Sequence, residues 1–377
     1  MHAHPTHLAL AVALSSSLAR AEPPAAPPPA LVFVEGAAPG KSPVVLGTAD
    51  FGASTFTPVL EDLPTGTWGM AVHAASGTWA LSGAPTGGEP LALAGQKPVA
   101  VPGAATLLVG KAGAAGFQQL AGDPTCRTAK CYEVAAGFTP DAGAVLTQQL
   151  RLGGTRLVSV GLDAAHRRAT VFDRPGAAQP VLSADQRRVG YLTGGALFVE
   201  PLPLAKAKPQ PLGRPTLLMD SPLALASEQL LFFRREPVEQ RRGFIEAWKV
   251  GAKTAALGWA LPADFPMLSE QMVFSPAAST VLLADAEHSE LGGNLVAIAV
   301  PGLQARKLAT GVRRVLDASP DGRWALVVRR KDPARADYAD NPEQLVVIDL
   351  GTGTEGAVLA TGVPGAKIPL GRFFTRR

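Results

Sequence analysis

A turn followed by an apolar strand recurs along the chain, and this repeat constrains the fold more than any other feature. Its clearest copy is SPDGRWALVV at 319–328, and successive copies start 41 to 51 residues apart. The others are SPAASTVLLA (275–284), ALASEQLLFF (224–233), SADQRRVGYL (183–192) and TPDAGAVLTQ (139–148), with a weaker copy AASGTWALSG (74–83) and a further candidate VPGAATLLVG (101–110). A unit this short cannot bury both faces of a sheet alone, so the copies must pack on one another.

The residues after each turn repeat as well. The segments NPEQLVVIDLGTG (341–353), GGNLVAIAVPG (292–302), GGALFVEPLP (194–203) and RGFIEAWKVG (242–251) each read as a strand that runs into a turn. One unit is therefore a turn, a buried strand, a variable loop, a second strand, another turn and an outer strand. Short strands at a period of about 44 residues are typical of β-propeller blades. We predict an all-β protein with a single β-propeller of about seven four-stranded blades, within a range of six to eight.

Composition agrees with many short strands. The 377 residues include 40 Gly and 34 Pro, which indicates many turns. Frequent turns between short elements favour an all-β architecture.

The turn at 319–322 is interpreted as architecture and not as a reactive site. Proline fixes φ, aspartate can cap its own backbone and glycine accepts a positive φ. In other copies the position of Asp321 is taken by Ala277 or Ala226. A structural turn tolerates such replacements.

The pair ASPDGRWALVV and EQLVVIDLGTG is similar to the repeats of TolB-like and WD-repeat-like bacterial propellers. The similarity extends over 183–353 and is weak over 30–130. It implies the propeller fold and transfers no site residues, because the matching positions are turns and strands. TolB carries an α/β domain before its propeller, and here the strand-like ALVFVEG (30–36) leaves no room for one.

The N-terminus indicates export. LALAVALSSSLARA (8–21) is an apolar run that ends in Ala-Arg-Ala, the pattern of a signal-peptidase site. The run is too short to span a membrane, and a Pro-rich segment follows it, which argues against a buried helix. We expect a signal peptide at 1–21, a Pro-rich mature N-terminus at 22–30, a propeller domain at 31–377, and a periplasmic or secreted protein without a transmembrane anchor.

The two cysteines, Cys126 and Cys131, are expected to form a disulfide. Their spacing differs from the CxxC of zinc and thioredoxin-like sites, and an even count in an exported chain favours a bond. Free thiols remain the alternative.

Charge and motifs exclude several classes of protein. The net charge of +4 comes from interspersed residues without a basic, aromatic-rich stripe, which argues against nucleic-acid binding. No GxSxG, P-loop, HExxH or GxGxxG motif occurs, so we predict no catalytic residue, cofactor or metal site. His73 and His166 lie beside repeat turns and are interpreted as solvated or hydrogen-bonded blade residues.

The variable loops between the second and third strands are the best candidates for binding. They are RREPVEQRRG (234–243), DAEHSELGG (285–293) and RRKDPARADYADN (329–341), and in a propeller they emerge on one face near the central channel. The candidate binding residues are Arg234, Arg235, Asp285, Glu287, His288, Asp332, Asp337 and Asp340. Solvated charge is the alternative, and the loops lack the ordered spacing of a calcium site.

These observations favour an exported, non-catalytic binding or scaffolding module, monomeric, whose partner is a protein or a cell-envelope polymer. The alternative is a propeller enzyme, a lyase or hydrolase, with a charged pocket at the channel mouth. A purely structural propeller that has lost partner domains is the third hypothesis.

Overall fold

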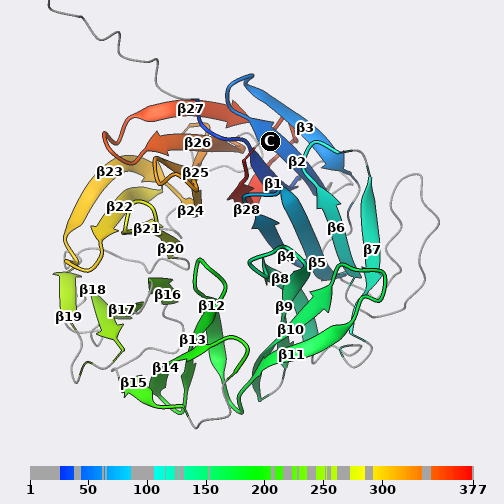
Figure 1. Cartoon of the computed structure of the whole chain (residues 1–377). Coiled ribbons are helices and arrows are strands. Elements are labelled where there is room, and N and C mark those ends of the chain that lie inside the picture. The colour runs from blue at the N-terminus through cyan, green and yellow to red at the C-terminus, as the bar shows by residue number, and fades with distance from the viewer. Residues whose placement is uncertain are drawn as a thin grey trace, which may run out of the picture.

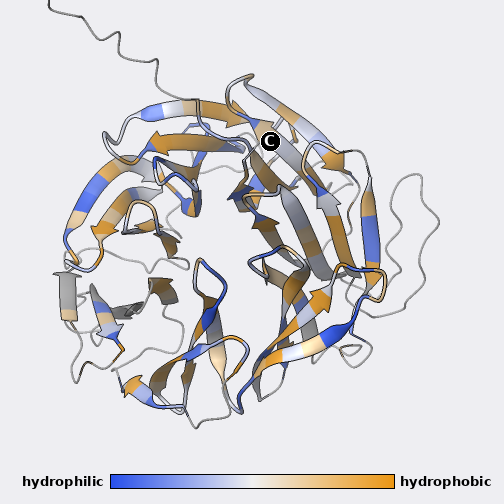
Figure 2. Cartoon of the chain, viewed as in Figure 1, coloured by the Kyte–Doolittle hydropathy of each residue, from blue (hydrophilic) through white to orange (hydrophobic). Residues whose placement is uncertain are grey.

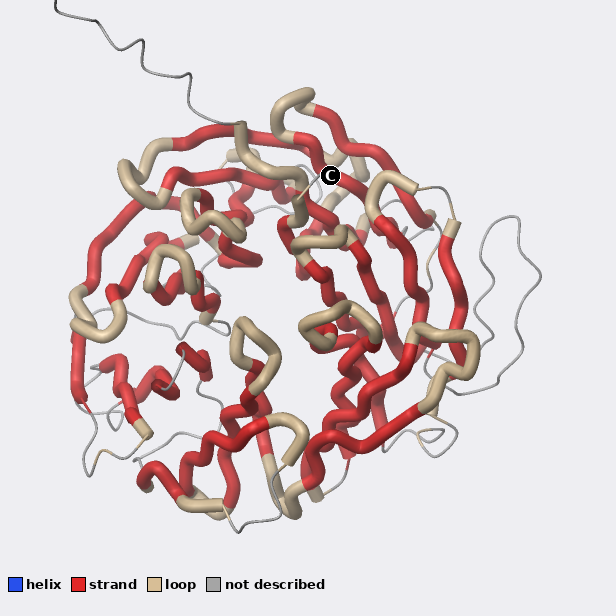
Figure 3. The backbone as a smooth tube through the Cα atoms, in the orientation of Figure 1, coloured by secondary structure: helices blue, strands red, loops and turns tan. Residues whose placement is uncertain are grey.

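The computed structural model describes residues 26–37, 44–61, 63, 66–85, 106–114, 116–123, 126, 131–151, 153–204, 209–214, 223–226, 229–235, 243–250, 252, 256–260, 272–284, 292–332 and 341–375. These residues form seven four-stranded antiparallel sheets (Figure 1). The sheets stand in a ring around a central axis, and the described chain consists of strands and loops (Figure 3). The predicted all-β propeller is confirmed, and seven sheets fall within the predicted range.

In every sheet the strands follow one another outwards from the axis. The first sheet contains β28 (Lys367–Phe373), β1 (Ala30–Glu35), β2 (Val44–Asp50) and β3 (Thr55–Leu60). The second and third contain β4 (Gly66–His73), β5 (Thr78–Pro85), β6 (Thr106–Lys111) and β7 (Phe117–Ala121), then β8 (Cys131–Phe138), β9 (Ala144–Arg151), β10 (Gly154–Gly161) and β11 (Arg168–Asp173). The fourth and fifth contain β12 (Ala178–Leu182), β13 (Arg188–Thr193), β14 (Ala196–Pro201) and β15 (Pro211–Gly213), then β16 (Leu223–Ala226), β17 (Gln229–Arg235), β18 (Gly243–Lys249) and β19 (Ala256–Ala260). The sixth and seventh contain β20 (Val273–Ser275), β21 (Thr280–Ala284), β22 (Gly293–Ala299) and β23 (Ala305–Val312), then β24 (Arg314–Ala318), β25 (Trp324–Arg330), β26 (Glu343–Asp349) and β27 (Glu355–Ala360).

The continuous apolar runs of the repeat arise because a blade packs on both faces. Successive residues of a strand point to opposite faces of its sheet. In β25, Leu326 and Val328 enter the core shared with the first sheet, whereas Ala325 and Val327 enter the core shared with the sixth. Hydrophobic residues accordingly occur along many of the strands throughout the ring (Figure 2). Because both faces of such a strand are buried, hydrophobic and polar residues do not alternate along it.

The turn at 319–324 is closed by a set of short-range hydrogen bonds. Ser319 Oγ donates to Asp321 Oδ1 at 2.5 Å and accepts from the backbone N–H of Trp324 at 2.8 Å. Asp321 Oδ1 also accepts from the N–H of Arg323 at 3.1 Å. The side chains thereby satisfy backbone donors that the strands leave unpaired. The interpretation of this segment as a structural turn agrees with these bonds.

Two other copies reproduce this bonding. In the turn at 183–188, Ser183 Oγ donates to Asp185 at 2.6 Å and accepts from the N–H of Arg188 at 2.9 Å. In the turn at 139–144, Thr139 Oγ1 donates to Asp141 at 2.6 Å and accepts from Ala144 N–H at 3.0 Å. In each turn the hydroxyl donates to the carboxylate two residues later. This bond explains why a serine or threonine stands two residues before the aspartate.

Five of the described turns contain a residue with a positive φ. It is the fourth residue of the copy for Gly77, Ala142, Gln186 and Gly322 and the fifth for Ser279, and the φ angles lie between 47° and 72°. Only two of the five are glycine, although side-chain-bearing residues are strained in this region. The turn geometry is thus maintained by its hydrogen bonds even where the sequence is unfavourable.

The ring is closed between the two ends of the chain. Strand β28 pairs antiparallel with β1, from Ala30 opposite Phe373 to Glu35 opposite Lys367. The N–H of Phe374 adds a hydrogen bond to the carbonyl of Pro29 at 3.0 Å. The last strand therefore supplies the innermost strand of the first sheet.

One copy of the repeat was assigned incorrectly. Residues 101–105 lie outside the described residues, and 106–110 belong to β6, the third strand of its sheet. Any apolar strand after a Pro-Gly pair resembles the repeat, so the pattern alone could not separate a second strand from a third. In the first sheet, the corresponding turn is replaced by the junction between β28 and β1.

The positive-φ position predicts opposite effects for two substitutions. Gly322→Ala should destabilise the protein by about 2 kcal/mol, from the cost of the left-handed conformation and from contact with the next turn. A Cβ at Gly322 would lie 2.6 Å from the backbone nitrogen of Ala278. Ala142→Gly should stabilise by up to about 1 kcal/mol, because it relieves the same strain. Chemical unfolding of the two variants beside the wild type checks this, and a shift of both in one direction would contradict it.

Candidate binding sites

The three predicted loops connect equivalent strands of three consecutive sheets. They join β17 to β18, β21 to β22 and β25 to β26, the second strand to the third in each case. In an antiparallel meander, all such connections leave the sheets at the same end. The strand ends that flank these loops therefore lie at one end of the ring.

Most of the candidate residues lie outside the described residues. These are Asp285, Glu287, His288, Asp337 and Asp340. Arg234 and Arg235 form the end of β17, paired with Phe244 and Gly243. Asp332 is exposed at the start of its loop. Their role in binding stays a prediction.

The base of the third loop is held by a buried asparagine. Asn341 is 1% exposed, and its side chain bonds to both backbone groups of Asp332: Oδ1 accepts from the N–H at 2.7 Å, and Nδ2 donates to the carbonyl at 2.6 Å. The N–H of Lys331 also donates to the carbonyl of Pro342 at 3.0 Å. Both ends of this loop are thus fixed to the blade.

A buried glutamate, Glu343, connects the base of this loop to the closing strand β28. Glu343 is 1% exposed, and its carboxylate accepts from the N–H of Ile368 in β28 at 2.6 Å. Arg314 lies 3.1 Å from the same carboxylate and also donates to the carbonyl of Ile368. Arg313 approaches the other oxygen at 3.5 Å. A buried charge of this kind is stable only with such partners. The loop base is consequently connected to the closing strand.

A recess of about 340 Å³ lies at the opposite end of the ring, near the axis. It is lined by β4 and its turn (71–75), by β8 (136–138), by Ala184 and Gln186 of the next turn, and by Arg372 of the closing strand. Its walls are mostly small side chains, with His73, Gln186 and Arg372 as the large polar groups. The sequence pattern does not reveal this recess, because its residues belong to the turns and inner strands of the repeat.

The two described histidines are hydrogen-bonded blade residues, as expected. The Nδ1 of His73 lies 2.9 Å from Ser76 Oγ, and its ring meets Phe138 edge-on. The Nε2 of His166 lies 3.0 Å from Gln118. His288 lies outside the described residues.

Arg372 and Asp317 meet on two neighbouring inner strands. Arg372 donates to the carbonyls of Leu316 and Gly371. Asp317 Oδ2 accepts from the N–H of Phe373 at 2.8 Å. Burial raises the pKa of Asp317 above its ordinary value, although the charge of Arg372 and this hydrogen bond act in the opposite direction.

Two further buried carboxylates, Glu200 and Glu133, are each neutralised by an arginine. Glu200 lies 2.5 Å from Arg174 and accepts from the Tyr191 hydroxyl at 2.5 Å. Burial opposes ionisation of Glu200, but the hydrogen bonds of Arg174 and Tyr191 outweigh it and lower the pKa. Burial, together with Glu200, raises the pKa of Tyr191. This set ties the residue that follows β11 of the third sheet to β13 and β14 of the fourth.

The third sheet contains the second set. Glu133, 1% exposed, lies 2.6 Å from Arg168 and accepts from Thr147 at 2.7 Å and from the N–H of Asp123 at 2.8 Å. The carboxylate of Asp123 lies 3.1 Å from Arg156. No group of three or more metal-ligating side chains occurs among the residues that the structure describes.

The predicted disulfide is present beside this set. Cys126 and Cys131 are bonded, and Cys131 is the first residue of β8. The bond fixes the connection between the second and third sheets, three residues from Asp123. It constrains a short segment and not the ring as a whole.

Comparisons with known proteins place the chain by fold alone. No family model and no curated protein matches the sequence. A Lactobacillus plantarum protein has 12% identity over 92% of this chain and 99% of its own, with a TM-score of 0.54. The periplasmic gluconolactonase of Pseudomonas aeruginosa has 15% identity over 90% and 99%, with a TM-score of 0.51. TolB of Acinetobacter baumannii is also similar, with 11% identity over 93% and 83% and a TM-score of 0.46.

The first two likenesses agree with the propeller fold and carry no assignment of activity.

The described residues include no helix of a length and hydrophobicity that would cross a membrane.

Asp317 and Asp185 are predicted to respond oppositely to pH. The raised pKa of Asp317 means that its ionisation costs stability, so Asp317→Asn should gain stability relative to the wild type as pH rises through the folded-state pKa. The hydrogen bond from Ser183 lowers the pKa of Asp185. Asp185→Asn should therefore lose stability at neutral pH and match the wild type below the folded-state pKa. Unfolding midpoints between pH 3 and pH 8 measure both, and parallel curves for the two variants would refute the assignment.

Proposed function

We propose that this protein is an exported, non-catalytic β-propeller that binds a protein or a cell-envelope polymer in the periplasm or outside the cell. The binding face is the end of the ring that carries the loops 234–243, 285–293 and 329–341. The protein acts as a monomer and presents these loops as one surface.

The observation that carries this proposal is the arrangement of the strands that flank the three loops. These strands are equivalent in consecutive sheets, so their ends lie at one end of the ring although they are far apart in sequence. Rigid blades with variable loops at one end are a frequent arrangement in binding proteins. Asn341 and Glu343 support a fixed base for the third loop.

Charge in these loops suits recognition more than stability. Arg234, Arg235, Asp285, Glu287 and His288 offer both signs of charge. The acidic group of the third loop is Asp332, Asp337 and Asp340. Exposed charges contribute little to folding, but they steer association and discriminate between partners.

Export rests on two features. The apolar segment 8–21 ends in Ala-Arg-Ala, as a cleaved signal peptide does. The bond between Cys126 and Cys131 suits an oxidising compartment.

The catalytic alternative would use the recess at the other end of the axis. His73 and Arg372 bring basic groups there. Both are engaged in the scaffold, His73 with Ser76 and Arg372 with two backbone carbonyls. This engagement favours the binding role.

Export predicts a defined mature N-terminus. The protein isolated from the envelope or medium of the producing cells should begin at Glu22, because cleavage follows Ala21. Intact mass measures this directly. Retention of residues 1–21 in the exported protein would contradict it.

The binding face predicts a separation of binding from stability. Replacement of Asp285, Glu287 and His288 by alanine should remove the partner recovered by cross-linking from the envelope fraction, with little change in melting temperature. Asp321→Ala should do the reverse, since it removes a turn cap that contributes about 1 kcal/mol.

Quantitative mass spectrometry of the cross-linked material, beside a thermal melt of each variant, provides the two readouts. Partner recovery that ignores the triple substitution and is lost with Asp321→Ala would overturn the assignment of this face. Substrate turnover that depends on His73 and Arg372 would favour the enzyme instead.

A further inference from the structure

A cleft of about 590 Å³ lies between the sixth and seventh sheets, where the third loop (329–341) begins. Residues 309–311 of β23 form one wall, and the seventh sheet with the start of its loop forms the other. The second wall contributes three charged side chains, those of Arg329, Lys331 and Glu355. The described lining contains no large apolar side chain, so the cleft suits a charged ligand.

The three charged residues lie on one face of the seventh sheet. Val327 of β25 enters the core shared with the sixth sheet, and alternate residues of a strand share a face, so Arg329 and then Lys331 are on the same side. Glu355 of β27 lies opposite Ile348, which belongs to that core as well. All three side chains therefore face the sixth sheet, across the cleft.

The two positive groups are separate points along the cleft. Arg329 pairs with Gln344, whereas Glu355 pairs with Ile348, four residues further along β26. Arg329 Nη1 nevertheless donates to Glu355 Oε1, so the arginine side chain extends along the sheet towards Glu355. Lys331 lies two residues from Arg329 in the other direction. A ligand that meets both cations must be elongated and carry more than one negative group.

The backbone that carries Lys331 is fixed. Its N–H donates to the carbonyl of Pro342 at 3.0 Å, and Asn341 bonds to both backbone groups of the next residue, Asp332. The ammonium group of Lys331 is exposed and has no hydrogen-bond or ion-pair partner within the described chain. A positive charge on a rigid base lowers the entropy cost of binding an anion.

The ion pair between Arg329 and Glu355 leaves room for a second carboxylate. The two side chains are 27% and 44% exposed, and ion pairs of this kind contribute little to stability. Only Nη1 of the guanidinium is engaged, and Nε and Nη2 have no partner among the described residues. Because a guanidinium has five N–H donors, a carboxylate of another molecule can share it with Glu355 or replace Glu355.

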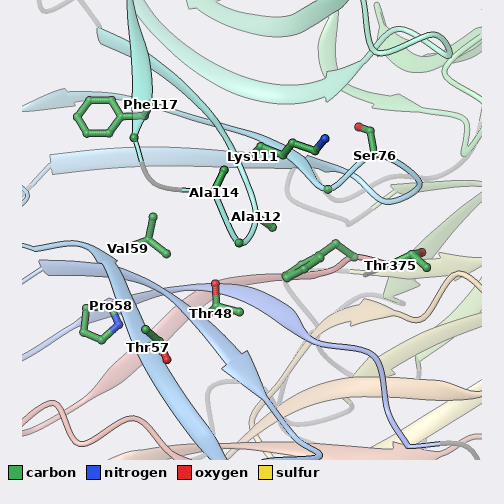
Figure 4. Close-up of a pocket in the computed structure, with 14 residues that line it drawn as sticks. Thr48, Thr57, Pro58, Val59, Ser76, Lys111, Ala112, Ala114, Phe117 and Thr375 are labelled. Carbon is green, nitrogen blue, oxygen red and sulfur yellow. The ribbon is translucent and has the colours of Figure 1, made fainter. Parts of the chain in front are cut away.

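A larger groove between the first and second sheets lacks this arrangement. It encloses about 830 Å³, and Lys111 is the one charged residue in its described lining. Lys111 and Phe117 point in opposite directions there (Figure 4). An anionic ligand would meet one isolated lysine in that groove. Lys111 thus provides a comparison for Lys331, since both are exposed lysines at the end of a strand.

We propose that the cleft between the sixth and seventh sheets binds an extended acidic segment of a partner protein, in which one carboxylate pairs with Lys331 and another with Arg329. Ala309 and Gly311 of the opposite wall have little side chain, so main-chain groups of β23 are accessible to such a segment. This inference rests on the proposed function, because the cleft opens beside the third loop, and it names the chemistry of the partner.

Fluorescence anisotropy with a fluorescein-labelled octaglutamate peptide tests the proposal on the full-length mature protein. Octaglutamate should bind saturably at low ionic strength, and octaglutamine should not bind. Added salt should weaken the binding of octaglutamate, because the charges of the cleft lie at the surface.

Two substitutions in the cleft should act in opposite directions. Lys331→Gln should weaken octaglutamate binding about two- to fivefold, the effect of one exposed ion pair. Glu355→Gln should strengthen it by a similar factor, because it removes the carboxylate that competes for Arg329. Lys111→Gln changes the net charge as much as Lys331→Gln does and should leave the affinity unchanged. Equal melting temperatures of the variants establish that each is folded.

Several outcomes would overturn the proposal. Equal weakening by Lys331→Gln and Lys111→Gln would mean that the peptide responds to net charge and not to the cleft. Weaker binding to Glu355→Gln would mean that the ligand does not use the guanidinium of Arg329. Saturable binding of a uronic-acid octasaccharide that depends on Lys331, without binding of octaglutamate, would assign the cleft to an acidic polysaccharide instead.

Recovery of the cross-linked envelope partner separates this inference from the proposed function. If recovery depends on Asp285, Glu287 and His288 while octaglutamate binds Lys331→Gln as it binds the wild type, the loop face stands and the cleft assignment is wrong. If octaglutamate binding depends on Lys331 and no envelope partner is recovered, the cleft assignment stands and the proposed function is wrong.

Discussion

The pairing of β28 with β1 is the interaction on which the rest of the structure depends. An open row of seven sheets would expose one face of the first sheet and one face of the seventh, each lined by apolar side chains. The last strand prevents this because it brings β24 against β28 and completes the core around Val32, Leu326 and Ile368. Glu343 and Asp317 reinforce the same joint, since each accepts from a backbone N–H near the closing strand. Ring closure therefore determines both the core and the shape of the surface.

Polar groups inside the blades follow from that packing. A four-stranded blade leaves polar side chains between apolar layers, where an unpaired charge would cost several kcal/mol. Glu133, Glu200 and Glu343 are each bonded to arginine and to a further donor. The local turn bonds of Ser319 and its equivalents act at the ends of the strands. Interior ion pairs and turn caps thus stabilise different parts of the same unit.

The fold was predictable from the sequence because each repeat is local. SPDGRWALVV contains its own turn bonds and its own two-faced strand, so the pattern needs no tertiary information. The surface sites are different. The recess joins His73 of β4 and Arg372 of β28, which meet only after the ring has closed. The loops could be located in the sequence by their position between strands. The two hydrogen bonds by which Asn341 holds the backbone of Asp332 could be found only in the structure. Residues 101–110 show the limit of pattern matching, since third strands also follow turns.

The placement of β28 also makes the completed chain a condition for a closed surface. A chain that emerges from its N-terminus presents β1 long before Lys367–Phe373 exists. During that interval β1 has an open edge, and open edges recruit other extended chains. Strand β28 of the same molecule covers this edge, from Ala30 opposite Phe373 to Glu35 opposite Lys367. A product that stops before β28 keeps the edge of β1 open and is exposed to aggregation and proteolysis.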